Sequence, residues 1–312
     1  PLQLDDLSAL RAFLTDSSQT KLIHSASEDL EVFSHWLGVL PAPLFDTQRA
    51  AALVGLGAGQ SYRALVAHFF DIELPKDETQ SNWLQRPLTD AQAHYAALDV
   101  TYLHPIGVQL HNRAMECNRL DWVLEEGARL RPGGKPPIAK FKTAYRLQPE
   151  QQRVLAEVVE WREGEARQRD RPRSWILNDK IVMGVARAVP RSVRELAAIE
   201  DMPQGLVRRA GDDLVGRIID AADSDTDQAP AVIPKPLASE QRGSVSMLSE
   251  CLKEIAESLE IPAEVLMPKA DLEHLVREQM NPSLAAPENW SGWRAETVVA
   301  PLRERLKERA AS

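Results

Sequence analysis

Apolar residues recur along most of this chain with the spacing of helices, and near its beginning they form two short strand-like runs. Lys21–His24 has the pattern of the end of a buried strand, and Leu44–Phe45 predicts a second strand. Ser61 is placed to cap an amphipathic helix over Tyr62–Phe70. A longer amphipathic helix is predicted over Gln148–Arg169, with six residues available for burial: Leu147, Val154, Leu155, Val158, Val159 and Trp161. The pattern therefore predicts an α/β segment followed by helices.

Two stretches with the composition of linkers divide the helical part. Arg131–Pro137 is rich in proline and glycine, and Ala222–Pro236 is acidic at first and then rich in proline. Between them, four or five short helices within about 80 residues predict a small bundle, with Asn178 or Asp179 and Ser192 as helix caps. Beyond the second linker, helices are predicted over Gln241–Glu257, Pro262–Leu266, Lys269–Gln279 and Glu296–Ala310.

A polar helical stretch carries a tyrosine and an aspartate of chemical interest. Thr89 is predicted as its N-cap, and Gln92 completes a capping box. Tyr95 and Asp99 lie four residues apart, so the phenol and the carboxylate project from one face of the helix. A carboxylate binds hard divalent cations, and a neighbouring phenol can orient a metal-bound water. Taken alone, this spacing is more often found in an ordinary helix with a half-buried tyrosine and a solvated aspartate.

A second aspartate follows the first predicted strand. Asp29 lies in the first turn of the helix that begins after His24, with Ser25 or Ser27 as the expected cap. Functional groups of α/β folds gather at such strand ends. Asp46 follows the second strand, where an N-cap or a tie to a neighbouring loop suits it better than a catalytic role.

Four patterns occur in order in the first part of the chain: His24-Ser-Ala-Ser-Glu-Asp29-Leu-Glu-Val-Phe33, Phe45-Asp46-Thr47-Gln48, Lys76…Trp83-Leu-Gln-Arg86-Pro87-Leu88 and Tyr95-Ala-Ala-Leu-Asp99-Val. Together they closely resemble the ribonuclease D family. That family belongs to the DEDD exonucleases, in the branch whose last motif carries a tyrosine. The resemblance to its nuclease part extends from residue 1 to residue 126.

The resemblance implies a metal-dependent 3′–5′ exonuclease that releases nucleotides from RNA, with the 3′ ends of tRNA precursors as the usual substrate. Asp29 and Asp99 would hold the metal ions, Mg²⁺ or Mn²⁺, and Tyr95 would position the attacking water. The family's first motif, an Asp-x-Glu pair on a strand, is not found before Lys21. We interpret the chain as a fragment and expect it to have little or no exonuclease activity by itself.

Four further residues are assigned to substrate binding. The resemblance implies this role for His24. The other three lie in one predicted loop, which offers a cation, an aromatic ring and a second cation: Lys76, Trp83 and Arg86. Such a loop suits phosphate contacts and base stacking. A surface loop with Trp83 held in the core explains the same residues equally well.

A second resemblance lies in the predicted bundle: Trp161-Arg162-Glu-Gly-Glu-Ala166, Arg171-Pro172-Arg173-Ser-Trp175-Ile-Leu-Asn-Asp179 and Pro190-Arg-Ser192. These patterns are similar to the HRDC domain, which RecQ-type helicases share with ribonuclease D and which is usually assigned nucleic-acid binding. Five arginines would form a phosphate-facing patch: Arg162, Arg167, Arg169, Arg171 and Arg173. Acidic residues lie between them, so a solvated helix face is the alternative.

The fold class that follows is α+β and α: a truncated ribonuclease-H-like α/β exonuclease domain followed by two all-α HRDC-like helical bundles. We expect a partial exonuclease domain over residues 1–130, an HRDC domain over 147–225 and a second, degenerate HRDC-like domain over 239–312. The last rests on the ending Trp290-Ser-Gly-Trp293-Arg294, which resembles the second HRDC-like unit of bacterial ribonuclease D.

Composition narrows the partners. The net charge of −9 argues against a generally basic nucleic-acid binder, so RNA contacts must be local. Cys117 and Cys251 build no disulfide framework, and no apolar run reaches membrane-spanning length. We therefore expect a cytoplasmic monomer that binds RNA and no membrane.

Two other interpretations remain. The protein could be a non-catalytic RNA-binding protein in which HRDC-like bundles bind RNA on a nuclease scaffold. It could also be a DNA exonuclease or a helicase accessory protein. The glycine-rich stretch Gly55–Gly59 is not followed by the Lys-Ser/Thr of a nucleotide-binding loop, which argues against a motor.

Overall fold

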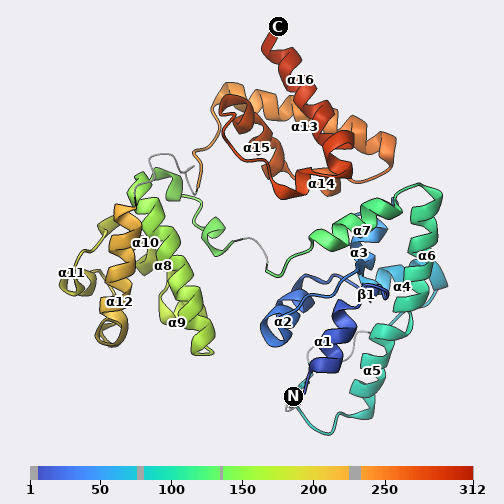
Figure 1. Ribbon diagram of the computed structural model, residues 1–312, viewed down its shortest axis with the longest axis horizontal. Coiled ribbons are helices and arrows are strands. Elements are labelled where there is room, and N and C mark those ends of the chain that lie inside the picture. The colour runs from blue at the N-terminus through green and yellow to red at the C-terminus, as the bar shows by residue number, and fades with distance from the viewer. Residues whose placement is uncertain (1–5, 76–80, 134–135, 225–232, 312) are drawn as a thin grey trace. The chain divides into compact units, whose positions relative to one another are not determined.

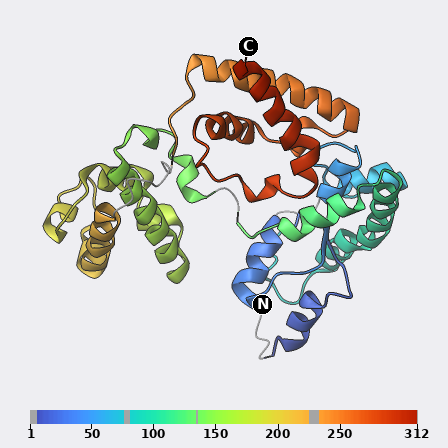
Figure 2. The same cartoon turned by 45° about the horizontal axis from the view of Figure 1, so that its top comes forward.

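The computed structural model describes residues 6–75, 81–133, 136–224 and 233–311. The chain forms two compact units (Figures 1 and 2). Unit 1 consists of Pro1–Gly134 together with Ser239–Ser312, and unit 2 consists of Lys135–Ala238. The expected third domain over 239–312 is therefore packed with the first segment of the chain, and unit 2 is inserted between the two segments of unit 1.

A small parallel sheet lies at the centre of the first segment. Strand β1 (Lys21–Ile23) pairs with β2 (Leu44–Asp46), with Leu22 opposite Phe45, and helix α2 (Ser27–Leu37) connects the two strands. The core beside the sheet contains Ala26, Leu30, Leu44 and Leu130. Around it lie α1 (Ser8–Thr15), α3 (Thr47–Leu53), α4 (Tyr62–Phe70), α5 (Asp90–Thr101), α6 (Leu103–Glu116) and α7 (Leu120–Arg129). Both predicted strands are confirmed.

Helix α7 approaches the backbone of β2 more closely than a side chain would allow. A Cβ atom at Gly127 would lie 1.8 Å from the carbonyl oxygen of Leu44. Glycine is therefore required at this position of α7 for the helix to contact the strand.

The stretch that follows Asp99 is divided between two helices, α5 and α6. Helix α5 ends at Thr101 and α6 begins at Leu103, so Pro105 lies in the first turn of α6. Proline is tolerated there because the N–H groups of the first turn have no partner within the helix. The break between the two helices therefore comes at Tyr102, before the proline.

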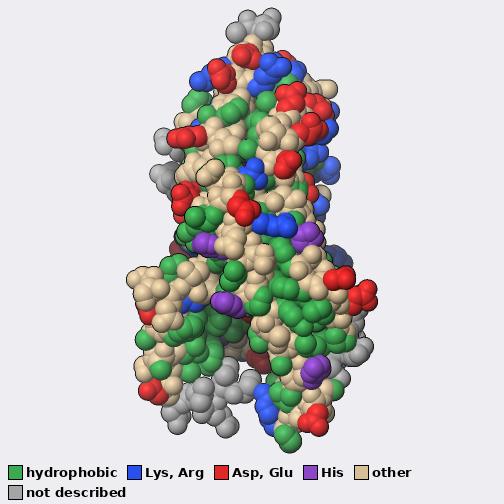
Figure 3. All heavy atoms as spheres, turned by 90° about the vertical axis from the view of Figure 1, so that its right-hand side faces the viewer, with side chains coloured by type: hydrophobic (Ala, Val, Ile, Leu, Met, Phe, Trp, Pro, Cys, Tyr) green, Lys and Arg blue, Asp and Glu red, His purple; other side chains and the backbone are tan. Residues whose placement is uncertain are grey.

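Part of the sheet's apolar side remains open. A cavity of about 370 Å³ is lined by Leu22 and Phe45 of the strands and by His104, Val108 and His111 of α6. Hydrophobic side chains, with histidines among them, gather on this side of the molecule (Figure 3). Helices α6 and α7 thus cover the sheet only in part.

The last segment of unit 1 is helical and contacts the first segment through a hydrogen bond and stacked rings. Its elements are α13 (Ser239–Leu259), α14 (Ala263–Leu266), α15 (Lys269–Met280), a π-helical turn (Ala295–Val299) and α16 (Ala300–Ala311). The Arg119 guanidinium donates to the carbonyl of Leu259 at 2.6 Å. The rings of Trp122 and Trp293 stack at 4.4 Å, with 9° between their planes. Both segments therefore contribute to one folded body.

Unit 2 is the helical bundle that the sequence predicted. Its elements are α8 (Pro149–Gln168), α9 (Arg173–Ile176), α10 (Asp179–Ala188), α11 (Val193–Ala197) and α12 (Gln204–Asp223). Its core includes Val158, Leu196, Leu214 and Ile218. The Asn178 side chain accepts from the N–H of Ile181, and the Ser192 hydroxyl accepts from that of Glu195, which confirms both predicted caps.

Candidate active site

The helix that carries Tyr95 and Asp99 begins as predicted. The N–H of Gln92 donates to the Thr89 hydroxyl at 3.1 Å, and the N–H of Thr89 donates to the Gln92 amide oxygen at 3.0 Å. The buried Gln92 side chain also donates to the carbonyl of Asn82 at 3.2 Å, which ties the preceding loop to α5. That loop brings the ring of Trp83 to 5.9 Å from the half-buried ring of Tyr95.

The Asp99 carboxylate projects from the exposed side of α5. Loss of solvent through partial burial raises the pKa of its carboxyl above the ordinary range. Tyr62 of α4 lies close enough that the charge of Asp99 acts on its phenol. The pKa of Tyr62 is raised, chiefly by burial, against the lowering effect of a hydrogen bond from the N–H of Tyr102.

The Tyr62 hydroxyl holds the end of α5. It donates to the carbonyl of Leu98 at 3.0 Å and accepts from the N–H of Tyr102 at 3.0 Å. Its ring lies 5.8 Å from the imidazole of His24, edge to face. Sequence reasoning missed Tyr62, because within an amphipathic helix it looks like any core-facing residue.

His24 follows strand β1 and faces α3. Its Nδ1 lies 2.9 Å from the hydroxyl of Thr47. Burial lowers the pKa of the imidazole, against the raising effect of the nearby Asp46 carboxylate. His24 and Asp99 thus both neighbour Tyr62, at the end of β1 and at the end of α5.

Asp29 lies in the first turn of α2, as predicted, and its side chain is exposed. Partial burial raises the pKa of its carboxyl, and the negative charges of Glu28 and Asp46 raise it further. Each of the carboxyls assigned to metal binding, Asp29 and Asp99, is therefore easier to protonate than a free aspartate.

The start of α2 is organised by Asp46, which is buried. Its carboxylate accepts from the N–H groups of Ser25 at 3.2 Å and Ala26 at 2.9 Å, and also from Gln48 at 2.8 Å and Arg49 at 3.2 Å. One carboxylate thus caps α3 and fixes the turn into α2, which confirms its structural role. The expected cap by Ser25 or Ser27 was wrong: Ala26 occupies the cap position, no side chain caps the helix, and Asp46 binds the N–H groups of Ser25 and Ala26 just before it.

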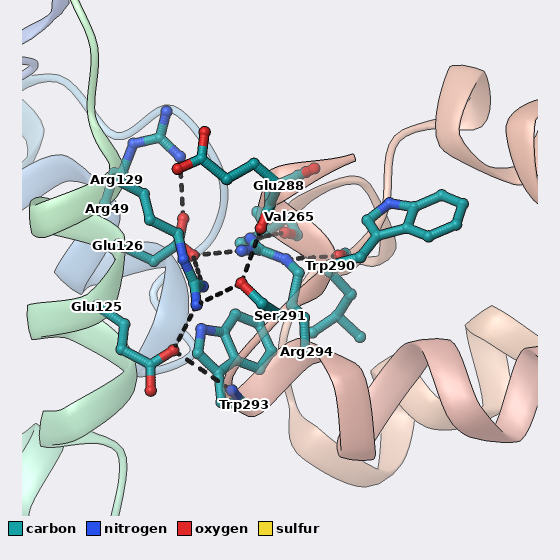
Figure 4. A network of polar contacts seen from close by, with 12 residues as sticks. Arg49, Glu125, Glu126, Arg129, Val265, Glu288, Trp290, Ser291, Trp293 and Arg294 are labelled. Carbon is teal, nitrogen blue, oxygen red and sulfur yellow. Dashed lines mark hydrogen bonds and ion pairs between the residues drawn. The ribbon is translucent and has the colours of Figure 1, made fainter. Parts of the chain in front are cut away.

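A buried ion-pair network continues from α3 to the last segment of the chain (Figure 4). The Arg49 guanidinium donates to the Glu126 carboxylate at 3.2 Å. Arg294, which like Glu126 is buried, pairs with the other oxygen of Glu126. Arg294 further donates to the carbonyls of Leu266 at 2.9 Å and Val265 at 3.0 Å. Hydrogen bonds therefore run without a break from Arg294 through Glu126 and Arg49 to the turn before Asp29.

The same residues line a cavity of about 480 Å³, which includes Ser25, Asp46, Arg49, Glu126 and Arg294. Its walls come from both segments of unit 1. The last segment therefore shapes the space beside the start of α2.

The described residues supply two carboxylates with the oxygen ligands that Mg²⁺ and Mn²⁺ prefer. No group of three or more His, Cys, Asp or Glu side chains gathers as a metal site within residues 6–75, 81–133, 136–224 and 233–311. Asp29 and Asp99 therefore fit such ions in kind but make up a partial set of ligands.

The predicted substrate loop is described only in part. Lys76 lies outside the described residues. Arg86 is exposed, and its guanidinium donates to the carbonyls of Trp83 at 2.9 Å and Gln85 at 2.7 Å. Of the predicted substrate residues, the structure brings Trp83 to Tyr95, and His24 to the Tyr62 that neighbours Asp99.

Arg162 does not belong to the predicted arginine patch. It is 0% exposed, and its guanidinium pairs with Asp179 at 2.7 Å and donates to the carbonyl of Leu177 at 3.2 Å. This position on α8 faces the core, so the side chain cannot reach a phosphate in the folded bundle. The other four arginines of the patch lie at the surface or are half-buried.

Comparisons with known proteins fit these two units. A family model described as a 3′–5′ exonuclease matches residues 1–114, and the HRDC domain model matches residues 151–218. The ribonuclease D of Pseudomonas paraeruginosa is 38% identical over 98% of this chain and 83% of its own length. The chain belongs to the ribonuclease D family. Members of this family are 3′–5′ exoribonucleases, and exonucleases of this type depend on divalent metal ions.

Other members of the ribonuclease D family agree. The enzyme of Escherichia coli is 30% identical over 99% of this chain and 84% of its own length. The crystal structure of Escherichia coli RNase D, described as an exoribonuclease involved in structured RNA processing, covers 99% of this chain with a TM-score of 0.79. The fold class that we predicted, an exonuclease domain with HRDC-type helices, is confirmed.

Among the described residues, no helix is both long and apolar enough to cross a membrane.

Proposed function

We propose that this ribonuclease D homologue removes nucleotides from the 3′ ends of tRNA precursors, with Asp29, Asp99 and Tyr95 as its reacting groups. The contact between Tyr95 and Trp83 carries the proposal. It sets an aromatic ring that can stack on a base beside the phenol that would position the attacking water.

In the proposed site, Asp29 and Asp99 hold divalent ions, Mg²⁺ or Mn²⁺. When bound, such ions supply an activated water and stabilise the leaving oxygen. Tyr95 accepts or donates a hydrogen bond to that water, and His24 contributes to the binding of the substrate. Trp83 stacks on a base near the 3′ end, and Lys76 and Arg86 contact phosphates.

RNA with a single-stranded 3′ end is the substrate that best suits this arrangement. Stacking on an aromatic ring needs an unpaired base, which the 3′ tail of a tRNA precursor offers. Arg167 and Arg171 of unit 2, which have no ion pair among the described residues, provide further phosphate contacts in the proposal. We also propose that the protein acts as a monomer in the cytoplasm, where its two free cysteines would stay reduced.

The test is degradation of a tRNA precursor labelled at its 5′ end by the full-length gene product. We expect stepwise shortening from the 3′ end with Mg²⁺ or Mn²⁺ and none with a chelator. Asp99→Asn should abolish the shortening while binding to the same RNA remains. Equal shortening by the variant would contradict the proposal, and so would release of internal fragments.

A further inference from the structure

One tryptophan of unit 2, Trp175, lies on the surface although the two residues that follow it in the chain are buried. In helix α9, Trp175 is 70% exposed, whereas Ile176 is 6% exposed. Leu177, which follows the helix, is also buried. This short helix is therefore anchored by its aliphatic residues and presents the indole to solvent. An exposed indole gives up the free energy that its burial would contribute, so stability does not explain its place.

A guanidinium lies over this indole. The Cζ of Arg171 is 5.7 Å from the centre of the Trp175 ring. The backbone holds Arg171 there, because its N–H donates to the carbonyl of Ala166 at 3.0 Å, across the turn that ends α8. The pair places a planar aromatic surface and a positive charge side by side.

The arginines of the patch differ in how far neighbouring carboxylates neutralise them. Arg169 pairs with Glu165 at 2.6 Å, and Arg173 pairs with Glu163 at 3.3 Å. In the part of unit 2 that the structure describes, neither Arg167 nor Arg171 has an ion pair with an acidic residue. Their charge is therefore available to a ligand.

We propose that Trp175 and Arg171 form a platform for single-stranded RNA. One base stacks on the indole, and Arg171 and Arg167 contact the flanking phosphates. An aromatic ring can stack only on a base that is not paired and stacked in a duplex, which selects single strands. The inference deepens the proposed function and rests on RNA being the ligand, but it does not depend on the assignment of the reacting groups.

The experiment measures binding of the full chain to a fluorescently labelled oligoadenylate of about 12 nucleotides, a length within the usual range of single-stranded sites. A chelator prevents cleavage, and fluorescence anisotropy reports the affinity. Trp175→Ala should weaken binding about 10-fold or more, as expected for the loss of one stacked base. Trp175→Phe should restore most of the affinity, because it keeps an aromatic ring.

Salt separates the two parts of the platform. Arg171→Ala should reduce the slope of log affinity against log salt by about 0.7, the value of one phosphate contact on a single strand. Trp175→Ala should weaken binding without changing that slope. Arg191→Ala is the matched control, because Arg191 is exposed in the same unit and fully paired with Asp223 at 2.7 Å. It should leave both affinity and slope unchanged.

The proposal is overturned if Trp175→Ala binds the oligoadenylate as tightly as the wild type, or if it weakens binding to a duplex of the same length equally. Unchanged circular dichroism and melting temperature would show that the variants are folded, as expected for exposed side chains. The outcome is independent of the nuclease assignment: Asp99→Asn tests the reacting groups, whereas Trp175→Ala tests binding in a chelator. Failure of either prediction would therefore not affect the other.

Discussion

The two carboxylates assigned to the reaction are held in different ways. The turn before Asp29 is fixed by Asp46, and Arg49, one of the residues that Asp46 caps, pairs with Glu126. Glu126 in turn binds Arg294, which lies 168 residues away in the sequence. The helix of Asp99 is instead fixed by a capping box within its own first turn and by one hydroxyl, that of Tyr62.

The turn before Asp29 is thus supported by charged side chains around the buried Glu126, whereas the helix of Asp99 is supported by local, neutral hydrogen bonds. A buried ion pair is costly to break, because the remaining partner is left charged without compensation. A neutral hydrogen bond at a helix end contributes much less. Disturbing the support of Asp29 should therefore unsettle the whole of unit 1, whereas disturbing that of Asp99 should act locally.

The largest expected effect is on the rate of RNA shortening, and it concerns the two carboxylates themselves. Substitution of Asp29 and substitution of Asp99 should lower this rate alike. Asp29→Asn and Asp99→Asn should each lower the rate of RNA shortening by at least about 100-fold, because even residues that only orient metal ligands cost 10- to 100-fold when removed. Tyr95→Phe should lower the same rate about 10-fold, since it removes one hydrogen bond and no metal ligand. Single-turnover kinetics would measure all three.

A large loss at one carboxylate and none at the other would break the symmetry of the proposed roles. The folded state of each variant is checked by its melting temperature.

The next effect distinguishes the two supports. Glu126→Ala should lower the free energy of unfolding by about 3 to 5 kcal/mol, because it leaves the buried guanidinium of Arg294 unpaired. Urea denaturation followed by circular dichroism would measure it. Arg49→Ala is the matched control, since its side chain is 45% exposed and its pair with Glu126 should contribute about 1 kcal/mol or less. Equal losses in the two variants would show that the network is not centred on Glu126.

A smaller loss of unfolding free energy is expected when the support of the Asp99 helix is disturbed. Tyr62→Phe removes the two hydrogen bonds that join Leu98 and Tyr102 and should cost about 1 to 2 kcal/mol. Hydrogen exchange should rise at the junction of α5 and α6 and remain unchanged in α2. A rise that spreads through both helices would contradict the local character of this support.

The smallest effect is a dependence on pH. The pKa values of Asp29 and Asp99 are raised in the folded protein, chiefly by burial. Folding thus favours their protonated forms, so the associated stability is present below the ordinary aspartate pKa of about 3.9 and is lost as the pH rises through the raised values. Asp29→Asn and Asp99→Asn should therefore melt slightly above the wild type at neutral pH, and level with it in acid.

Salt sharpens this comparison. The pKa of Asp29 is also raised by the charges of Glu28 and Asp46, whereas that of Asp99 is raised by burial alone. Added salt should reduce the gain of Asp29→Asn more than that of Asp99→Asn, because it screens charges and not burial. Melting curves at low and high salt, recorded over a range of pH, would measure the difference.

The sequence predicted the local features and missed the distant ones. The capping box of Thr89 and Gln92 depends on residues three apart, so their identities were enough to predict it. Asp46 was predicted as a structural residue, but its hydrogen bonds to Ser25 and Ala26 join residues that lie 21 and 20 positions apart in the sequence. Nothing in the sequence near Glu126 points to Arg294, because only the fold brings them together.

Unit 2 shows the same limit in another form. The spacing of arginines along α8 and α9 suggested one continuous patch. Burial removes Arg162, and pairing with Glu163 and Glu165 neutralises Arg173 and Arg169. Which member of a series of like residues faces solvent depends on the helix phase and on tertiary contacts, so composition alone overstates such a surface.

The insertion of unit 2 within unit 1 has a consequence for synthesis on the ribosome. Glu126 is translated 168 residues before its partner Arg294. At about 5 to 20 residues per second, roughly 10 to 30 seconds pass between the two. During that interval residues 135–238 emerge complete and are able to fold first, while the segment with the two carboxylates that we propose as reacting groups waits for its last helices. The nuclease unit, although it is translated first, is thus the last to be finished.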